Sequence, residues 1–199
     1  GLGSNDDRKN VSKNLEFAIL SPLSDNKDFP NYKITNKTRI KDKNALFEVD
    51  QVDGYAMILD KEQFNDNFFD EKIFMYLEND DLCLRMKRKN KKIFIYSNSL
   101  ISHLGGKAVD KKYFDEIEFS RNWHWNWSKF YFRKKHYGFL VAFTLGFIIF
   151  VKSIFKSAYF SLVNNKFKSK LYYLRASGFI NALFNKSSSV ISVEMLSGF

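Results

Sequence analysis

The sequence predicts an α/β fold for this chain of 199 residues. Short apolar runs in the first half are typical of buried strands, because polar or turn-forming residues bound each of them. Longer apolar and aromatic segments after residue 110 are typical of helices. With 45% hydrophobic and 18% aromatic residues, the chain can bury a core, which argues against global disorder.

The predicted strands begin after a polar N-terminal segment, residues 1–14, and a polar loop separates the first two, residues 24–44. The apolar runs predict strands at Phe17–Leu20, Phe47–Leu59, Ile93–Tyr96 and Leu100–His103. Gly54 lies inside the second of these runs. A glycine within a strand often marks the close approach of another backbone or of a ligand.

The predicted helices follow from the spacing and length of apolar segments. Leu82 and Met86 are four residues apart and predict a helix over Asp80–Lys89. We expect three longer helices, at Lys111–Lys135, Gly138–Val163 and Phe167–Phe184.

The chain is strongly basic, with a formal net charge of +10. This charge favours nucleic acid, an anionic membrane surface or a phosphate-rich ligand as a partner. The single cysteine, Cys83, excludes an internal disulfide framework and fits a reducing compartment. The sequence starts GLGSNDDRKN, which is polar, does not resemble a signal peptide and has no initiator Met, so we expect it to begin inside a longer protein. A processed or tagged terminus is the open alternative.

An acidic cluster follows directly on an aromatic run, in the stretch FFDEKIFMYLENDDLCLR, residues 68–85. Acids beside apolar residues must be paired, hydrated or bound to a cation. One interpretation is structural: acids in a first helical turn are stabilised by the macrodipole, and Asp81 and Arg85 have the spacing of an i, i+4 ion pair. The other is functional, because a turn, carboxylates and then a helix can present acids at the rim of a pocket.

The order and spacing of several short motifs resemble family 2 glycosyltransferases, with the closest likeness to the rhamnosyltransferase-like branch that builds bacterial surface polysaccharides. The resemblance covers residues 17–136 well and the rest loosely. The matching pieces are Val52-Asp53-Gly54 with Ala56-Met57-Ile58, Phe69-Asp70-Glu71, Phe74-Met75-Tyr76, Glu78, Asp81-Leu82-Cys83, Arg85, His103 with Gly106, and Arg121-Asn122.

The resemblance implies a GT-A fold, a Rossmann-like α/β sandwich, of which this chain would be the acceptor-side half. It implies transfer of a sugar from a nucleotide-diphospho-sugar donor to a lipid-linked saccharide or polysaccharide acceptor, with inversion at the anomeric carbon. By position in the motif, Glu78 would be the general base on the acceptor hydroxyl. Many relatives carry E-D-x-D, and the second position here is Asn79, so Asp80 is a further candidate for the base.

The resemblance implies supporting roles for the remaining motif residues. Asp81 would order the pocket or bind acceptor hydroxyls, and Arg85 would hold Asp81. The residues expected to bind substrate are Gly54, Asp70, Glu71, Arg85 and Arg121.

His103 is a candidate metal ligand at the end of an apolar strand. Without the resemblance, a lone His of this kind is usually satisfied by a backbone group. In GT-A enzymes, however, a late His often completes the coordination of Mn²⁺ or Mg²⁺, which would neutralise charge on the diphosphate. The sequence shows neither a glycine-rich first βαβ unit nor a D-x-D motif after an apolar strand. We therefore expect the nucleotide-binding half to lie outside this chain and the isolated chain to be inactive.

The C-terminal third combines basic, aromatic and apolar residues, and we expect a domain boundary between residues 1–136 and a membrane-associating helical extension, residues 137–199. Tyr137–Val151 is uncharged, and ~15 residues reach only ~22 Å across a ~30 Å hydrocarbon core. This favours a peripheral helix or a single shallow anchor at the cytoplasmic face of the inner membrane. A core helix that packs on the rest of a longer protein is the open alternative.

Two other functions compete with the enzyme. One is a non-catalytic module that binds carbohydrate or a membrane surface, which Asn79 and the missing nucleotide half favour. The other is a nucleic-acid-binding protein, which the interleaved aromatic and basic residues of 121–136 allow. The acidic motif and the apolar helix argue against nucleic acid as a partner.

Overall fold

The computed structural model describes residues 46–52, 54, 57–60, 68–96 and 110–188. The chain forms two compact units, residues 1–69 with 79–108 and residues 70–78 with 109–199. The predicted α/β class is wrong, because the described residues are mostly helical, with four α-helices and one two-stranded sheet. The predicted strands at Phe17–Leu20 and Leu100–His103 lie outside the described residues.

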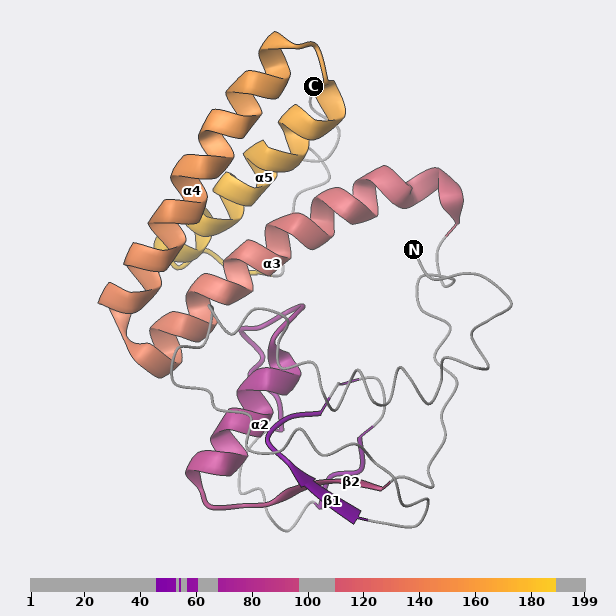
Figure 1. The fold of residues 1–199 in the computed structure, drawn as a ribbon, viewed down its shortest axis with the longest axis vertical. Coiled ribbons are helices and arrows are strands. Elements are labelled where there is room, and N and C mark those ends of the chain that lie inside the picture. Colours follow the sequence, from indigo (N-terminus) through magenta and orange to yellow (C-terminus); the bar gives the residue numbers. More distant parts are fainter. Residues whose placement is uncertain (1–45, 53, 55–56, 61–67, 97–109, 189–199) are drawn as a thin grey trace. The chain divides into compact units, whose positions relative to one another are not determined.

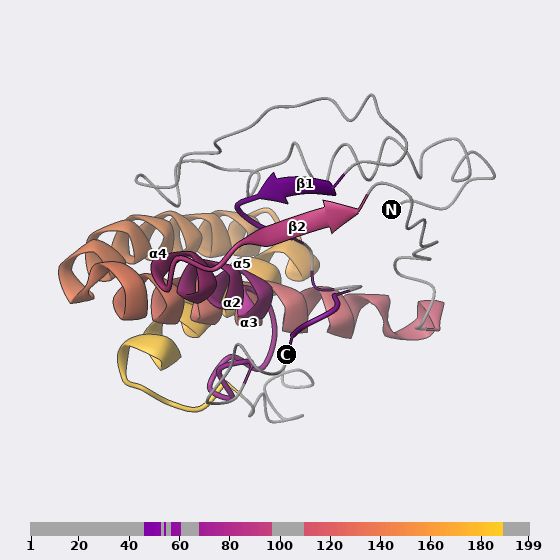
Figure 2. The same ribbon diagram turned by 90° about the horizontal axis from the view of Figure 1, so that it is seen from below.

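The first unit holds a short sheet and a helix. Strand β1, Leu46–Val49, pairs antiparallel with β2, Ile93–Tyr96, so that Leu46 lies opposite Tyr96 and Val49 opposite Ile93 (Figure 2). Strand β2 has the predicted bounds, whereas β1 ends ten residues before the predicted strand. After Val49, Gln51 and Val52 bond to side chains of helix α2 in place of a neighbouring strand.

Helix α2 spans Glu78–Arg88 and confirms the predicted helix within two residues. Its three basic residues in the last turn, Arg85, Lys87 and Arg88, oppose the negative end of the helix dipole. The helix ends in a Schellman motif: Asn90 has a positive φ of 55°, and the Lys91 N–H donates to the Met86 carbonyl at 3.0 Å.

The second unit is built on three helices: α3, Phe114–Tyr137; α4, Phe139–Leu162; and α5, Lys166–Leu183 (Figure 1). A 3₁₀ turn, η2, Lys111–Tyr113, precedes α3. All three long helices were predicted within three residues. Gly138, with φ of 90°, makes the turn from α3 into α4. Asn164 ends α4 with a φ of 54°, and the Asn165 side chain caps α5 by accepting from the Lys168 N–H at 3.0 Å.

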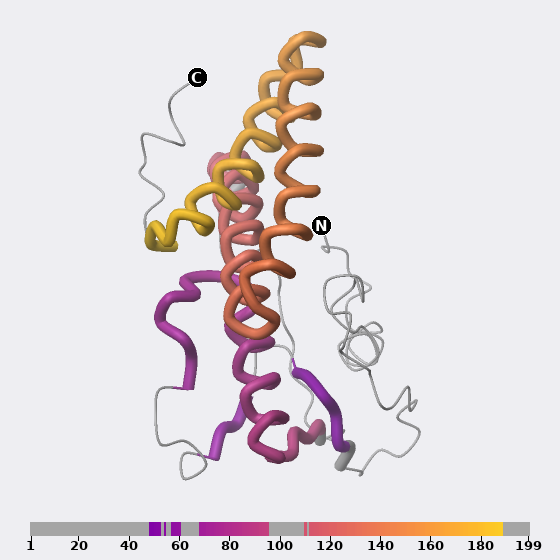
Figure 3. The backbone as a smooth tube through the Cα atoms, turned by 90° about the vertical axis from the view of Figure 1, so that its left-hand side faces the viewer, coloured from indigo at the N-terminus to yellow at the C-terminus, as the bar shows by residue number. Residues whose placement is uncertain are grey.

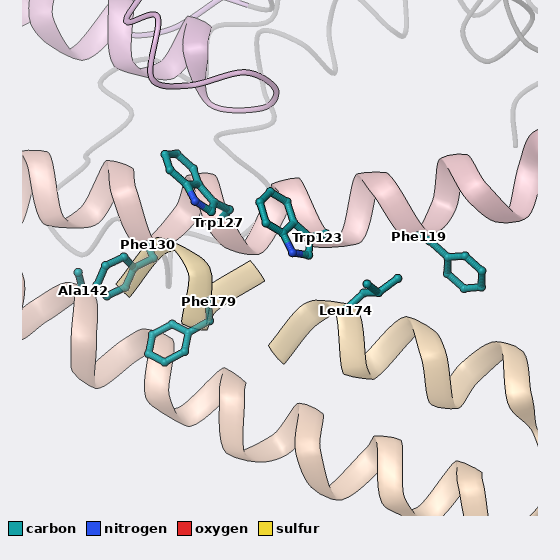
Figure 4. Packing of buried hydrophobic residues seen from close by; sticks show 8 residues of the cluster. Phe119, Trp123, Trp127, Phe130, Ala142, Leu174 and Phe179 are labelled. Carbon is teal, nitrogen blue, oxygen red and sulfur yellow. The ribbon is translucent and has the colours of Figure 1, made fainter. Parts of the chain in front are cut away.

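The core of this unit lies where α3 packs on α4 and α5, which run side by side (Figures 3 and 4). It consists of Phe119, Trp123, Trp127, Phe130, Ala142, Leu174, Phe179 and Ala182. A Cβ atom on Gly178 would lie 2.4 Å from the Trp123 carbonyl oxygen, so only glycine permits this approach of α5 to the α3 backbone. The domain boundary predicted between residues 136 and 137 stays a prediction. In the structure, helix α3, which ends at Tyr137, packs on both α4 and α5.

Helix α4 is long and apolar enough to cross a membrane, by length and composition alone. Only 17% of its most apolar 18-residue window is buried, so the helix is not enclosed by the described part of the chain.

Candidate functional site

The segment Asp70–Glu78 leads into helix α2 through an unusual backbone conformation. Tyr76 and Leu77 both have φ of 68°, in the left-handed region that bulky side chains rarely adopt. Such residues cost free energy and persist only where surrounding contacts hold them. Two contacts from α3 do so here: Ser128 Oγ donates to the Met75 carbonyl at 2.7 Å, and Arg121 Nε donates to Tyr76 Oη at 2.8 Å. These contacts hold the segment on α3 within the second unit.

Glu78 differs from the other acids of the cluster. Its side chain is half-buried, and its Oε2 atom is buried without a hydrogen-bond partner among the described residues. An unpartnered buried oxygen is costly, and its explanations include local strain, a bound water or ion, and a catalytic role.

Asp80 and Asp81 are both buried and both paired within the first unit. Asp81 is fully buried and accepts from Arg85 Nε at 2.8 Å, which confirms the i, i+4 pair. The Arg85 guanidinium also donates to the Phe68 carbonyl. Asp80 accepts from the Gln51 side chain, which joins the chain after β1 to the first turn of the helix. These two carboxylates thus stabilise the local fold.

Asn79 and Gly54 lie next to each other in the first unit. The Asn79 side chain donates to the Val52 carbonyl at 3.1 Å, and a Cβ on Gly54 would lie 3.4 Å from the Asn79 Cβ. Gly54 is in a turn and not in a strand, which corrects the predicted strand Phe47–Leu59. The Val52 carbonyl meets a helix side chain where a sheet would have provided a neighbouring strand.

Asp70 anchors the other end of the segment on α3. Its Oδ2 accepts from Lys135 Nζ at 2.7 Å and Tyr131 Oη at 2.9 Å, while its Oδ1 accepts from the Lys72 N–H at 3.0 Å. Burial raises the pKa of Asp70, but the hydrogen bonds from Lys135, the Lys72 N–H and Tyr131 outweigh it and lower the pKa. Glu71, predicted beside it as a substrate ligand, is exposed.

Further contacts show that the whole segment lies along one side of α3. The rings of Tyr76 and Trp125 meet edge to face, with centroids 5.5 Å apart. Ser188, after α5, accepts from the Phe74 N–H at 3.1 Å and donates to the Lys72 carbonyl. The α3 residues that contact the segment are Arg121, His124, Trp125, Ser128, Tyr131 and Lys135. Their spacing places them opposite the α3 residues that pack on α4 and α5, so α3 separates the segment from that helix pair.

His124 is a buried titratable group that the sequence did not single out. It lies between the rings of Phe74 and Trp123, with centroids 5.1 and 5.0 Å away. Burial lowers its pKa, and its Nδ1 has no hydrogen-bond partner among the described residues. Its position on α3 follows from the helical period, but its burial depends on the distant segment that covers it.

The predicted site residues therefore fall into two groups. Within the first unit, the structure brings Asp80, Asp81 and Arg85 together on α2, with Gly54 beside Asn79. In the second unit Asp70 and Arg121 both lie along α3 but apart, because Asp70 contacts Lys135 and Arg121 is 14 residues earlier, about 21 Å along the helix. His103 lies outside the described residues, and the described ones contain no group of three or more His, Cys, Asp or Glu that could hold a metal.

No local sequence pattern marks Ser128, Tyr131 or Lys135, which hold the segment in place. Each meets a residue more than 50 positions away. No protein-family model, curated protein or solved structure matches the chain.

Proposed function

We propose that this chain is part of a membrane-associated, rhamnosyltransferase-like family 2 glycosyltransferase. It would transfer a sugar, with inversion, from a nucleotide-diphospho-sugar to a lipid-linked or polysaccharide acceptor in bacterial cell-surface polysaccharide synthesis. The proposal rests on the motif resemblance and on one observation, the half-buried Glu78 with an unpartnered Oε2. It does not depend on the GT-A architecture that the sequence suggested.

Glu78 is the general base in this proposal. The acceptor hydroxyl donates its hydrogen bond to the half-buried Glu78 carboxylate, and the proton moves to that carboxylate as the hydroxyl oxygen bonds to the anomeric carbon. The bond from that carbon to the diphosphate breaks, and the nucleoside diphosphate leaves. Asp81 is excluded as the base in this conformation, because its side chain is fully buried and paired with Arg85. Asp80 is a weaker candidate, since Gln51 donates to it and only 6% of the residue is exposed.

The proposed substrate-binding groups are exposed residues near Glu78, on the segment Asp70–Glu78 and on helix α3. Arg121 is exposed and lies beside the Tyr76 and Trp125 rings, a combination that suits a saccharide or a phosphate. Asp70 positions the segment and does not bind substrate in this proposal, because its carboxylate accepts hydrogen bonds from Lys135 and Tyr131. Binding of a divalent Mn²⁺ or Mg²⁺ ion by His103 stays a prediction, because His103 lies outside the described residues.

The membrane association rests on α4. Its length and apolar composition, together with its low burial, suit a peripheral helix or a single shallow anchor at the cytoplasmic face of the cell membrane. A lipid-linked acceptor would be presented at the same face.

The test is sugar transfer by the full-length protein in membranes, with a panel of UDP- and dTDP-sugars and extracted lipid-linked saccharides. We expect Glu78→Gln to abolish transfer and Glu116→Gln, the matched change at an exposed acid of α3, to retain most of it. Normal turnover by the Glu78 variant would reject the base assignment.

A non-catalytic module that binds carbohydrate or a membrane surface is the second candidate. It is favoured by the observation that Asp70, Asp80 and Asp81 all serve structural contacts. Vesicle or saccharide binding by the full-length protein, with no transfer from any donor of the panel, would support this candidate over the enzyme.

A further inference from the structure

The inward face of α4 is already occupied by the other helices of its unit. Ala142, Gly146 and Ser153 are buried there, and Phe143 and Phe150 pack beside them on the same core. Ser157 of α4 and Ser169 of α5 exchange hydrogen bonds, Oγ to carbonyl, at 2.9 and 3.0 Å. A further partner of α4 must therefore meet its opposite face.

The large apolar residues of α4 face outward along its whole length. They include Leu140, Phe147, Ile148, Ile154, Phe155, Tyr159 and Leu162. At 100° per residue they form one continuous stripe opposite the buried face, about 36 Å long for 24 residues. An exposed apolar stripe of this size marks an interaction surface.

The positions of two lysines indicate whether α4 would cross a bilayer or lie parallel to its surface. Lys152 and Lys156 are exposed and lie together on one flank of the stripe. Lys156 Nζ is 5.0 Å from the centroid of the Tyr172 ring on α5, so it is drawn sideways toward α5. A helix that crossed a bilayer would carry both charges into the hydrocarbon, whereas a helix parallel to the surface keeps both at headgroup depth.

The positive charge of the chain around α4 favours an anionic partner. From Phe119 to Val193 the sequence has twelve Lys and Arg and no Asp or Glu, although the whole chain carries only +10. Lys166, Lys168 and Lys170 begin the antiparallel α5 beside the flank that holds Lys156. Cations beside an apolar stripe complement anionic headgroups above acyl chains.

We propose that α4 lies flat in one leaflet of an anionic lipid bilayer, with its apolar stripe in the acyl region and its lysine flank at the phosphates, and that it does not cross. This inference refines the membrane partner of the proposed function. It does not depend on catalysis, so its test is independent of sugar transfer.

The first experiment measures binding of the full-length protein to vesicles of 30 mol% phosphatidylglycerol in phosphatidylcholine. Phe155→Asp should weaken the partition coefficient by about tenfold or more, since Phe155 is 72% exposed on the stripe. The matched control is Phe114→Asp, an exposed change at the start of α3 that should leave binding unaltered. Lys152→Gln should weaken binding about fivefold on these vesicles and not on pure phosphatidylcholine.

The second experiment distinguishes a flat helix from a spanning one. Single cysteines at Leu140 and Leu162, near the two ends of α4 and 77% and 87% exposed, carry an NBD label, while the native Cys83 is buried. Dithionite added outside the vesicles should quench both labels, because both ends lie in the outer leaflet. Protection of one label would show that α4 crosses and would overturn the proposal. Equal binding by the Phe155 and Phe114 variants, or no vesicle binding by the wild type, would also overturn the proposal.

Discussion

The anchoring of the segment Asp70–Glu78 on α3 can be tested through Asp70. In Asp70→Asn the side chain keeps its size and an acceptor oxygen but loses the charge that Lys135 meets at 2.7 Å. A hydrogen bond to a charged group contributes about 1.5–3 kcal/mol, whereas an exposed ion pair contributes about 0–1 kcal/mol. The Lys135 side chain is 27% exposed and that of Asp70 17%, so we expect an intermediate loss of about 1–2 kcal/mol in the free energy of unfolding.

The pH dependence gives the same interaction a second signature. The pKa of Asp70 is raised by burial but lowered overall by Lys135, the Lys72 N–H and Tyr131. A carboxyl whose folded pKa is lowered stabilises the protein above its unfolded pKa and ceases to do so as pH falls through the folded pKa. The wild type should therefore exceed Asp70→Asn in stability above about pH 5 and converge with it in more acidic solution.

The assay is urea unfolding of the wild type, Asp70→Asn, Lys135→Met and the double variant, at pH 7 and pH 3. The matched control is the exposed pair of Glu48 and Lys92, 2.9 Å apart, tested in the same way with Glu48→Gln and Lys92→Met. The reasoning predicts a larger coupling energy for Asp70 and Lys135, which disappears at pH 3. A coupling energy no greater than that of the control pair, or one that does not change with pH, would refute it.

Three further predictions concern the helices and the acceptor. Gly178→Ala places a methyl group 2.4 Å from the Trp123 carbonyl oxygen, so α5 must shift; we expect a loss of about 1–3 kcal/mol by thermal unfolding, and an unchanged melting temperature would contradict this close packing. Asn164→Ala should cost about 1 kcal/mol and Asn164→Gly much less, because φ at this position is 54°; equal stabilities of the two variants would argue against the left-handed cap. Helices α3 and α4, each about 10 Å thick, separate the Glu78 segment from the apolar stripe. A lipid-linked acceptor that carries several sugars should therefore be used faster than one that carries a single sugar. A preference for the shortest acceptor would count against this arrangement.

Local sequence patterns predicted the helices well, because their signals lie within a few residues. The period of Leu82 and Met86 located α2, and the uncharged run that begins at Tyr137 located α4 within one residue at each end. Asn90 and Asn164 were available as stop signals, since Asn tolerates the left-handed conformation that ends a helix. The α/β class failed because a short apolar run does not reveal its partner: β1 and β2 pair only with each other in the described residues.

The candidate site was predictable only where its contacts are local. The Asp81–Arg85 pair follows from spacing alone and is confirmed. The burial of Asp81, the pairing of Asp70 with Lys135 and the conformation of Tyr76 depend on residues far away in sequence, so no local pattern could assign them. Asp70, Asp80 and Asp81 all have structural partners, and Glu78 is the exception among the buried or half-buried acids of the cluster.

The central claim is that Glu78 accepts the proton of the acceptor hydroxyl, and the kinetics of Glu78→Gln with the full-length protein test it most directly. General-base catalysis contributes about 10²–10⁴-fold, so kcat should fall by that factor. The acceptor affinity, measured by binding, and the melting temperature should stay close to those of the wild type. A variant that transfers sugar at the wild-type rate, or that loses acceptor binding in place of turnover, would contradict the assignment.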